Sequence, residues 1–115
     1  MNADFYASDM VSPDKLASCL RITKEELACS VGLAKETLYR KNRSESQKVQ
    51  TRLREMTDVI NRVTPWAGSL AMAFAWYRSY GIPAFGGMTP EDVIKAGKSE
   101  ALREYISAIN VGGYA

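Results

Sequence analysis

Histidine is absent from this chain of 115 residues, and cysteine occurs only twice, as Cys19 and Cys29. Without an imidazole the chain by itself forms neither a Ser-His-Asp nor a Cys-His catalytic site, nor the common zinc sites that need histidine. Two thiols alone make a poor metal site, and we expect both to be small core residues rather than a disulfide. Since no nucleophile–base pair or cofactor loop stands out, we expect neither an enzyme nor a bound cofactor or metal.

Long apolar runs are also missing. The longest, WAGSLAMAFAWY, is interrupted by Gly68 and Ser69 and is too short to span a bilayer. The first residues, MNADFYASDM, lack the basic start and apolar core of a secretory signal. We therefore expect a cytoplasmic protein, and the 46% of hydrophobic and 24% of charged residues are typical of a folded soluble domain.

Positive charge is concentrated in one segment, although the net charge of the whole chain is only +2. Residues 35–54 carry seven basic and two acidic side chains, a net charge of +5, whereas residues 1–34 and 55–115 carry net charges of −2 and −1. A basic block of this kind either binds a polyanion, most often nucleic acid, or forms a solvated helix face.

Helix start and stop signals divide the chain into helices, and no strand pattern is visible, so the predicted fold is all-α. Proline after a serine or threonine cap, and a cap followed three residues later by an acid or amide, begin helices. These starts are Ser12-Pro13, Thr23 to Glu26, Ser44 to Gln47, Thr89-Pro90 and Ser99. Glycines or a proline end them, at Gly32, Pro65, Gly81 and Gly97.

Two longer segments carry most of the apolar residues. The helix from about residue 45 to 63 has an apolar seam that faces either the protein's own core or a partner helix. The seam consists of Val49, Leu53, Met56, Ile60 and Val63. Residues 66–80 are apolar on most sides, so they predict a buried central helix that Gly81 ends in the left-handed conformation. Residues 1–11 show no periodicity and are expected to form a flexible arm.

The stretch LACSVGLAKETLYR has the spacing of a helix-turn-helix. Leu27 and Val31 supply the apolar stripe of a first helix, Gly32 lies at the turn, and Leu38 faces inward from a short helix at 35–41. The pattern resembles the Xre, or phage repressor-like, family. It departs from that family at Ala34, where a serine or threonine cap is frequent, and at Lys41, where an apolar residue is usual.

The resemblance implies that the second helix enters the DNA major groove. Lys35 and Arg40 can then read guanine, and Glu36 can accept from cytosine, whereas Thr37, Arg43 and Lys48 contact phosphates. The expected DNA-binding residues are Lys35, Glu36, Thr37, Tyr39, Arg40, Arg43 and Lys48. The alternative is a three-helix scaffold that does not bind DNA.

The second half, WYRSYGIPAFGGMTPEDVIKAGKSEALREYISAINVGGYA, is similar to the toxin-binding domain of Xre/MbcA/ParS-type antitoxins. The similarity depends on Trp76, the turn at 83–87, Thr89-Pro90, Gly97 and the pair Gly112-Gly113. Here the glycines permit close approach of a partner, and Ile82, Phe85 and Met88 offer apolar contacts; alternatively, Ile82 and Phe85 complete the chain's own core. The expected toxin-binding residues are Trp76, Arg78, Ile82, Phe85, Gly86, Gly87, Met88, Tyr105, Gly112, Gly113 and Tyr114.

The resemblance implies an antitoxin of a type II toxin–antitoxin system. Such a protein binds and occludes a toxin, here a RES-domain enzyme that consumes NAD, and a homodimer represses the shared operon at operator DNA. The implied organisation is a flexible arm at 1–11, a helix-turn-helix region with its long connecting helix at 12–63, and a toxin-binding domain at 64–115. The alternative function is a stand-alone Xre-family transcription regulator whose C-terminal helices only dimerise.

Overall fold

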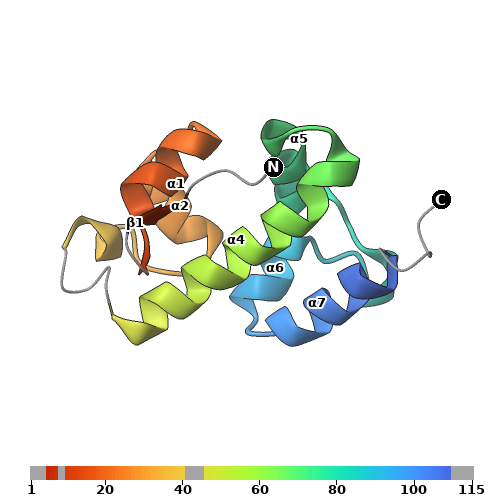
Figure 1. The fold of residues 1–115 in the computed structure, drawn as a ribbon. Helices are drawn as coiled ribbons and strands as arrows, with labels where there is room; N and C mark the ends of the chain where they lie inside the picture. Colours follow the sequence, from red (N-terminus) through yellow and green to blue (C-terminus); the bar gives the residue numbers. More distant parts are fainter. Residues whose placement is uncertain (1–4, 8–9, 41–45, 110–115) are drawn as a thin grey trace. The chain divides into compact units, whose positions relative to one another are not determined.

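The computed structural model describes residues 5–7, 10–40 and 46–109 and is predominantly helical (Figure 1), which confirms the predicted all-α class. The chain forms two compact units, residues 1–58 and 59–115. The helix α4, Gln47–Ala67, passes from the first unit into the second. The division therefore lies inside this helix, after residue 58, a few positions before the boundary after residue 63 that the sequence suggested.

A small β-hairpin begins the first unit. Strand β1, Tyr6–Ala7, pairs in antiparallel fashion with β2, Met10–Val11. The side chain of Gln50 on α4 accepts a hydrogen bond from the Val11 amide at 2.8 Å and donates one to the Val11 carbonyl at 3.0 Å. Phe5 is fully buried. The expected flexible arm is therefore, in its described residues, a packed hairpin. The buried Phe5 ring and the hydrogen bonds between the Gln50 side chain and the Val11 backbone attach it to the first unit.

The first two helices begin as their caps predicted. In α1, Pro13–Leu20, the Ser12 hydroxyl accepts from the Lys15 amide. In α2, Lys24–Ser30, Thr23 and Glu26 form the complete capping box. Gly32 follows α2 with a φ of 78°, the left-handed conformation expected at this turn.

The predicted helix at 35–41 is wrong in type and length. The chain forms only a single 3-10 turn, η1, Thr37–Tyr39, and Leu38 is its one buried residue. Lys41 lies outside the described residues. One apolar side chain offers too little burial to stabilise a full α-helix against its ordering cost, and no side chain caps the N-terminus of this turn.

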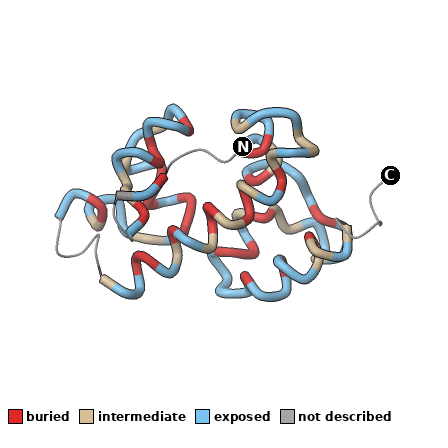
Figure 2. Tube along the Cα trace, viewed as in Figure 1, coloured by how far each residue is buried: buried red, intermediate tan, exposed pale blue. Residues whose placement is uncertain are grey.

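The long helix α4 continues past the predicted end at Thr64-Pro65. Its seam is buried in the chain, from Val49 to Val63, which confirms the core interpretation, and Figure 2 shows buried positions recurring along it. Ser46 accepts from the Val49 amide, while the expected cap, Ser44, lies outside the described residues. Pro65 has no backbone N–H, so it removes one hydrogen bond from the helix without ending it. The Gly68 amide still donates a hydrogen bond to the Thr64 carbonyl.

Residues 66–80 do not form one buried helix. Trp66 and Ala67 end α4, Gly68 and Ser69 interrupt the chain, and α5 covers Leu70–Ser79 with Ser69 as its cap. Only Ala73, Phe74 and Tyr77 of α5 are buried, and Met72 is 58% exposed. The serine cap starts a new helix after a glycine with a φ of 103°, so the apolar run is divided.

The second unit ends with η2, Pro83–Phe85, α6, Pro90–Lys95, and α7, Ser99–Ala108. Thr89 and Asp92 form the predicted capping box of α6, and Gly97 follows that helix with a φ of 78°. In α7, Leu102 and Ile106 are buried. Ser99 is the first residue of α7, one position after the N-cap Lys98, which makes no side-chain cap bond.

Candidate functional site

The turn between α5 and α6 is closed by its own backbone. The Ile82 amide donates to the Met88 carbonyl at 2.9 Å, and the Gly87 amide donates to the Ile82 carbonyl at 2.9 Å. Gly86 and Gly87 have φ values of 67° and 92°, and a Cβ atom on either would contact nothing within 4 Å. Glycine is therefore favoured at both positions by the positive φ and not by a lack of space, and the position of a side chain on either is open.

Gly81 is needed for a different reason than the sequence suggested. It does not adopt a positive φ; instead, a Cβ at this position would lie 3.0 Å from the Gly87 carbonyl oxygen. The helix α5 ends at Ser79, and the next residue, Tyr80, has an extended backbone. Gly81 thus permits the two ends of the turn to approach, and the prediction of a left-handed helix stop is wrong.

Aromatic rings form a partly exposed cluster around this turn, which we call the aromatic cluster. Trp76 makes an edge contact with Trp66 at 5.4 Å and stacks on Tyr80 at 5.5 Å between ring centroids. Phe85 makes an edge contact with Tyr105 at 5.8 Å. Burial, followed by the charge of Tyr80 and a hydrogen bond with it, raises the pKa of Tyr105 above 10.0. The Tyr80–Tyr105 bond connects the two groups of rings into one surface.

Most of the expected toxin-binding residues that the structure describes are accessible. Trp76, Phe85, Met88 and Tyr105 are half-buried, and Arg78, Gly86 and Gly87 are exposed. Ile82 is fully buried, so it belongs to the core of the second unit and cannot serve as a surface contact. The remaining three, Gly112, Gly113 and Tyr114, lie outside the described residues.

Two members of the aromatic cluster were missed from the sequence, Trp66 and Tyr80. Tyr80 is 40% exposed and stacks on Trp76, which lies four residues earlier and therefore on the same side of the helix. This spacing was a usable signal for Tyr80. Trp66 belongs to another helix, so only the tertiary structure brings it to Trp76.

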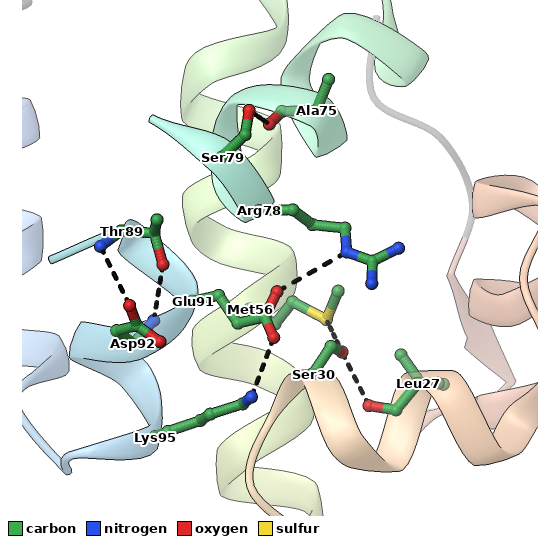
Figure 3. Close-up of polar contacts among 10 residues, drawn as sticks. All are labelled: Leu27, Ser30, Met56, Ala75, Arg78, Ser79, Thr89, Glu91, Asp92 and Lys95. Carbon is green, nitrogen blue, oxygen red and sulfur yellow. Dashed lines mark hydrogen bonds and ion pairs between the residues drawn. The ribbon is translucent and has the colours of Figure 1, made fainter. Parts of the chain in front are cut away.

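Arg78 belongs to a group of three charges that joins α5 to α6 (Figure 3). Its Nε lies 3.7 Å from a carboxylate oxygen of Glu91, whose other oxygen lies 2.9 Å from Nζ of Lys95. The guanidinium carbon lies 5.3 Å from the centroid of the buried Phe74 ring. The Glu91 side chain is only 15% exposed, while those of Arg78 and Lys95 are 46% and 37% exposed.

The expected DNA-binding residues are not carried by a helix at 35–41. Thr37 and Tyr39 lie on the turn η1, Lys35, Glu36 and Arg40 lie beside it, and Lys48 lies on α4. Lys35, Glu36, Tyr39, Arg40 and Lys48 are exposed and Thr37 is half-buried, whereas Arg43 lies outside the described residues. An exposed basic surface is therefore present. The α-helix that would carry these side chains into a major groove is not formed at Thr37–Tyr39.

Tyr39 interacts with α2 even though its ring is 54% exposed. Nζ of Lys24 lies 4.6 Å from the centroid of the Tyr39 ring. Desolvation, followed by the charge of Glu25 and a hydrogen bond with it, raises the pKa of Tyr39 above 10.0. Acidic side chains therefore lie beside this part of the basic surface.

Arg52 has a structural role that the sequence did not reveal. Its Nη1 donates to the Val31 carbonyl at 2.8 Å, at the C-terminal end of α2, where helix carbonyls lack partners. Arg52, one of the seven basic residues at 35–54, therefore links α4 to the end of α2 within the first unit. The remaining described ones give the surface its positive charge.

Both cysteines are free and exposed, so their expected place in the core is wrong. In α1 the buried side is formed by Leu16, Ala17 and Leu20, and Cys19 faces away from it; in α2 Leu27 and Ala28 are buried and Cys29 is not. Among the residues that the structure describes, no three His, Cys, Asp or Glu side chains are grouped to hold a metal ion.

None of the helices in the described ranges is both long and apolar enough to cross a membrane. Comparisons with models of protein families, with curated proteins and with solved structures found no match to this chain.

Proposed function

We propose that the chain is an antitoxin of a type II toxin–antitoxin system, which acts in the cytoplasm as a homodimer. Its second unit binds and occludes a partner toxin, a RES-domain enzyme that consumes NAD. Its first unit represses the shared operon by binding operator DNA. The similarity of residues 76–115 to antitoxin toxin-binding domains is the origin of the proposal.

The observation that carries the proposal is the turn at 81–88 with the aromatic cluster beside it. A backbone with two exposed positive-φ glycines lets a partner approach closely, and half-buried aromatic rings are the side chains that dominate protein interfaces. The turn is held by its own hydrogen bonds, so little ordering cost remains for binding.

The test is rescue of growth from the protein encoded by the adjacent gene. We expect Phe85→Ala combined with Gly87→Arg to abolish rescue, because the first change removes a ring contact and the second fills the space above the turn. Met72→Ala combined with Gly97→Arg is the matched control, since Met72 is an exposed apolar side chain outside the aromatic cluster. Gly97 also has a positive φ and open space, but it lies at the opposite end of α6, so rescue should persist.

If rescue is equal in the two double variants, the turn is not the toxin-binding surface. Circular dichroism of both variants checks that each is folded. Since both introduce an arginine at a positive-φ position, the backbone strain is similar and the comparison isolates the surface.

Support for the DNA-binding part comes from charge rather than from a recognition helix. We expect Lys35→Ala with Arg40→Ala to weaken binding to the chain's own promoter by about 1–3 kcal/mol for each side chain that reads a base. Lys98→Ala with Arg103→Ala removes the same charge from exposed positions in the second unit and serves as the control. Equal weakening in both variants would show that only the net charge matters.

The alternative function is a stand-alone regulator of the Xre family whose C-terminal helices only dimerise. The exposed lysines and arginines of the first unit are compatible with it. It predicts promoter binding and self-association without any effect on the adjacent gene's product. The rescue assay therefore separates the two functions.

A further inference from the structure

We infer that Arg78 receives a carboxylate side chain of the toxin, so that an aspartate or glutamate of the partner docks against the guanidinium beside the turn. The inference rests on the proposed function and names the chemistry of the contact. Its evidence is the group of three charges formed by Arg78, Glu91 and Lys95 (Figure 3).

The group has an excess of positive charge in a partly desolvated place. Two cations share one carboxylate, and Glu91 lies nearer to Lys95, at 2.9 Å, than to Arg78, at 3.7 Å. The charge of Arg78 is consequently only weakly compensated. A partly buried cation beside apolar groups gains from an additional carboxylate more than a fully solvated one does.

The guanidinium is oriented for a second partner. It approaches Glu91 through Nε, and in Figure 3 its two Nη atoms point away from that carboxylate. Among the described residues, neither Nη atom has a hydrogen-bond partner. The position over the Phe74 ring restricts the side chain, so a carboxylate can be bound by two parallel hydrogen bonds at reduced entropic cost.

The surroundings favour a protein carboxylate over a nucleic-acid phosphate. Residues 59–115 carry five basic and four acidic side chains, so this unit has no basic stripe that could follow a DNA backbone. Arg78 is two positions from both Trp76 and Tyr80, so it lies on another side of α5 than these two rings, and its own ring contact is with Phe74. Arginine is itself one of the residues enriched at protein–protein contacts.

The experiment measures binding of the adjacent gene's purified product to the full chain. We expect Arg78→Met to weaken binding at least about tenfold, because an interfacial charge pair of this kind contributes at least that factor. Glu91 keeps Lys95 in this variant, so the fold should persist, which thermal unfolding verifies. Arg103→Met removes the same charge from an exposed position on α7 and should change binding less than about twofold.

A charge exchange completes the test. Arg78→Glu should bind weakly to the natural partner and recover when one surface aspartate or glutamate of the partner is changed to arginine. Arg78→Lys keeps the charge without the planar fork and should lie between the natural chain and Arg78→Met. Failure of every such exchange would overturn the inference.

The outcomes separate this inference from the proposed function. If the natural chain binds the adjacent product and Arg78→Met binds it equally well, the carboxylate contact is wrong and the antitoxin function stands. If the natural chain does not bind that product, both are wrong. If Arg78→Met instead weakens promoter binding or self-association while partner binding is unchanged, the guanidinium serves DNA or a second copy, and the inference is overturned.

Discussion

The helices α2 and α6 share their local signals but lead to different structures. Each begins with a complete capping box, Thr23 with Glu26 and Thr89 with Asp92. Each is followed by a glycine with a φ of 78°. Between Gly32 and Arg40, where the described stretch 10–40 ends, the chain forms only the 3-10 turn η1, whereas after Gly97 it forms the ten-residue helix α7.

The difference shows what caps and glycines leave undecided. The segment after Gly97 buries Leu102 and Ile106, four residues apart on one side of a helix, and the segment after Gly32 buries only Leu38 within η1. Two buried apolar side chains one turn apart stabilise a helix because their burial offsets the entropy lost in ordering the residues between them. Start and stop signals therefore mark where a helix is allowed, and buried side chains decide whether it forms.

The largest expected effect is the truncation of a buried leucine in α7. Leu102→Ala should lower the free energy of unfolding by about 2–5 kcal/mol, as for other fully buried leucines. Leu38→Ala should lower the free energy of unfolding by only about 2 kcal/mol, the lower limit of this range. The three-residue turn can move into the cavity more easily than a helix can. Urea unfolding followed by far-ultraviolet circular dichroism measures both, and a larger decrease for Leu38→Ala contradicts this account of η1.

The two kinds of glycine give the next largest effect. Gly97→Ala and Gly81→Ala should each cost about 1–2 kcal/mol, the first through its positive φ and the second through the contact with the Gly87 carbonyl. Asparagine tolerates the left-handed conformation, so Gly97→Asn should cost less than Gly97→Ala. Gly81→Asn should bring no such relief, and if it does, the close approach is not the reason for Gly81. Chemical denaturation of the four variants provides the comparison.

Removal of the capping threonines should have a smaller and equal effect in the two units. Thr23→Ala and Thr89→Ala each delete one hydrogen bond of a box and should cost about 1 kcal/mol. Thr51→Ala, at an exposed position inside α4, is the control and should stay within about 0.5 kcal/mol of the natural chain. Unequal costs, seen in thermal or urea unfolding, would indicate that the two helix starts are not equivalent.

The smallest expected effect concerns the titration of Tyr105. Its pKa in the folded chain lies above the ordinary 10.0 because of burial and then Tyr80, so the folded state favours the neutral ring. The stabilisation is complete below pH 10 and disappears as the pH rises through the higher folded pKa. Tyr105→Phe should remove from the tyrosinate absorbance titration one step that lies above pH 10, and it should flatten the alkaline fall in stability. If the step that disappears instead lies at the ordinary pKa of 10.0, the Tyr80–Tyr105 contact is absent in solution.

Much of the candidate site could be predicted from the sequence because its signals are local. Gly86 and Gly87, the Thr89 capping box and the partly exposed positions of Phe85 and Met88 near them depend on residues a few positions apart.

The residues that were assigned wrongly show where local signals end. The prediction of Ile82 as a surface contact is wrong, since the same pattern suits a core residue at the base of the turn. The prediction of Cys19 and Cys29 as core residues is also wrong, because a small side chain fits either side of a helix.

The sequence by itself determined where helices α1, α2 and α6 begin, because a cap bonds to an amide three residues away in the same chain segment. Only the tertiary structure decided the contacts between distant segments. Gln50 holds Val11 across 39 positions, and Arg78 meets Glu91 from another helix. Such pairs depend on how the apolar sides of the helices pack, and that packing is a property of each folded unit rather than of any short stretch of residues.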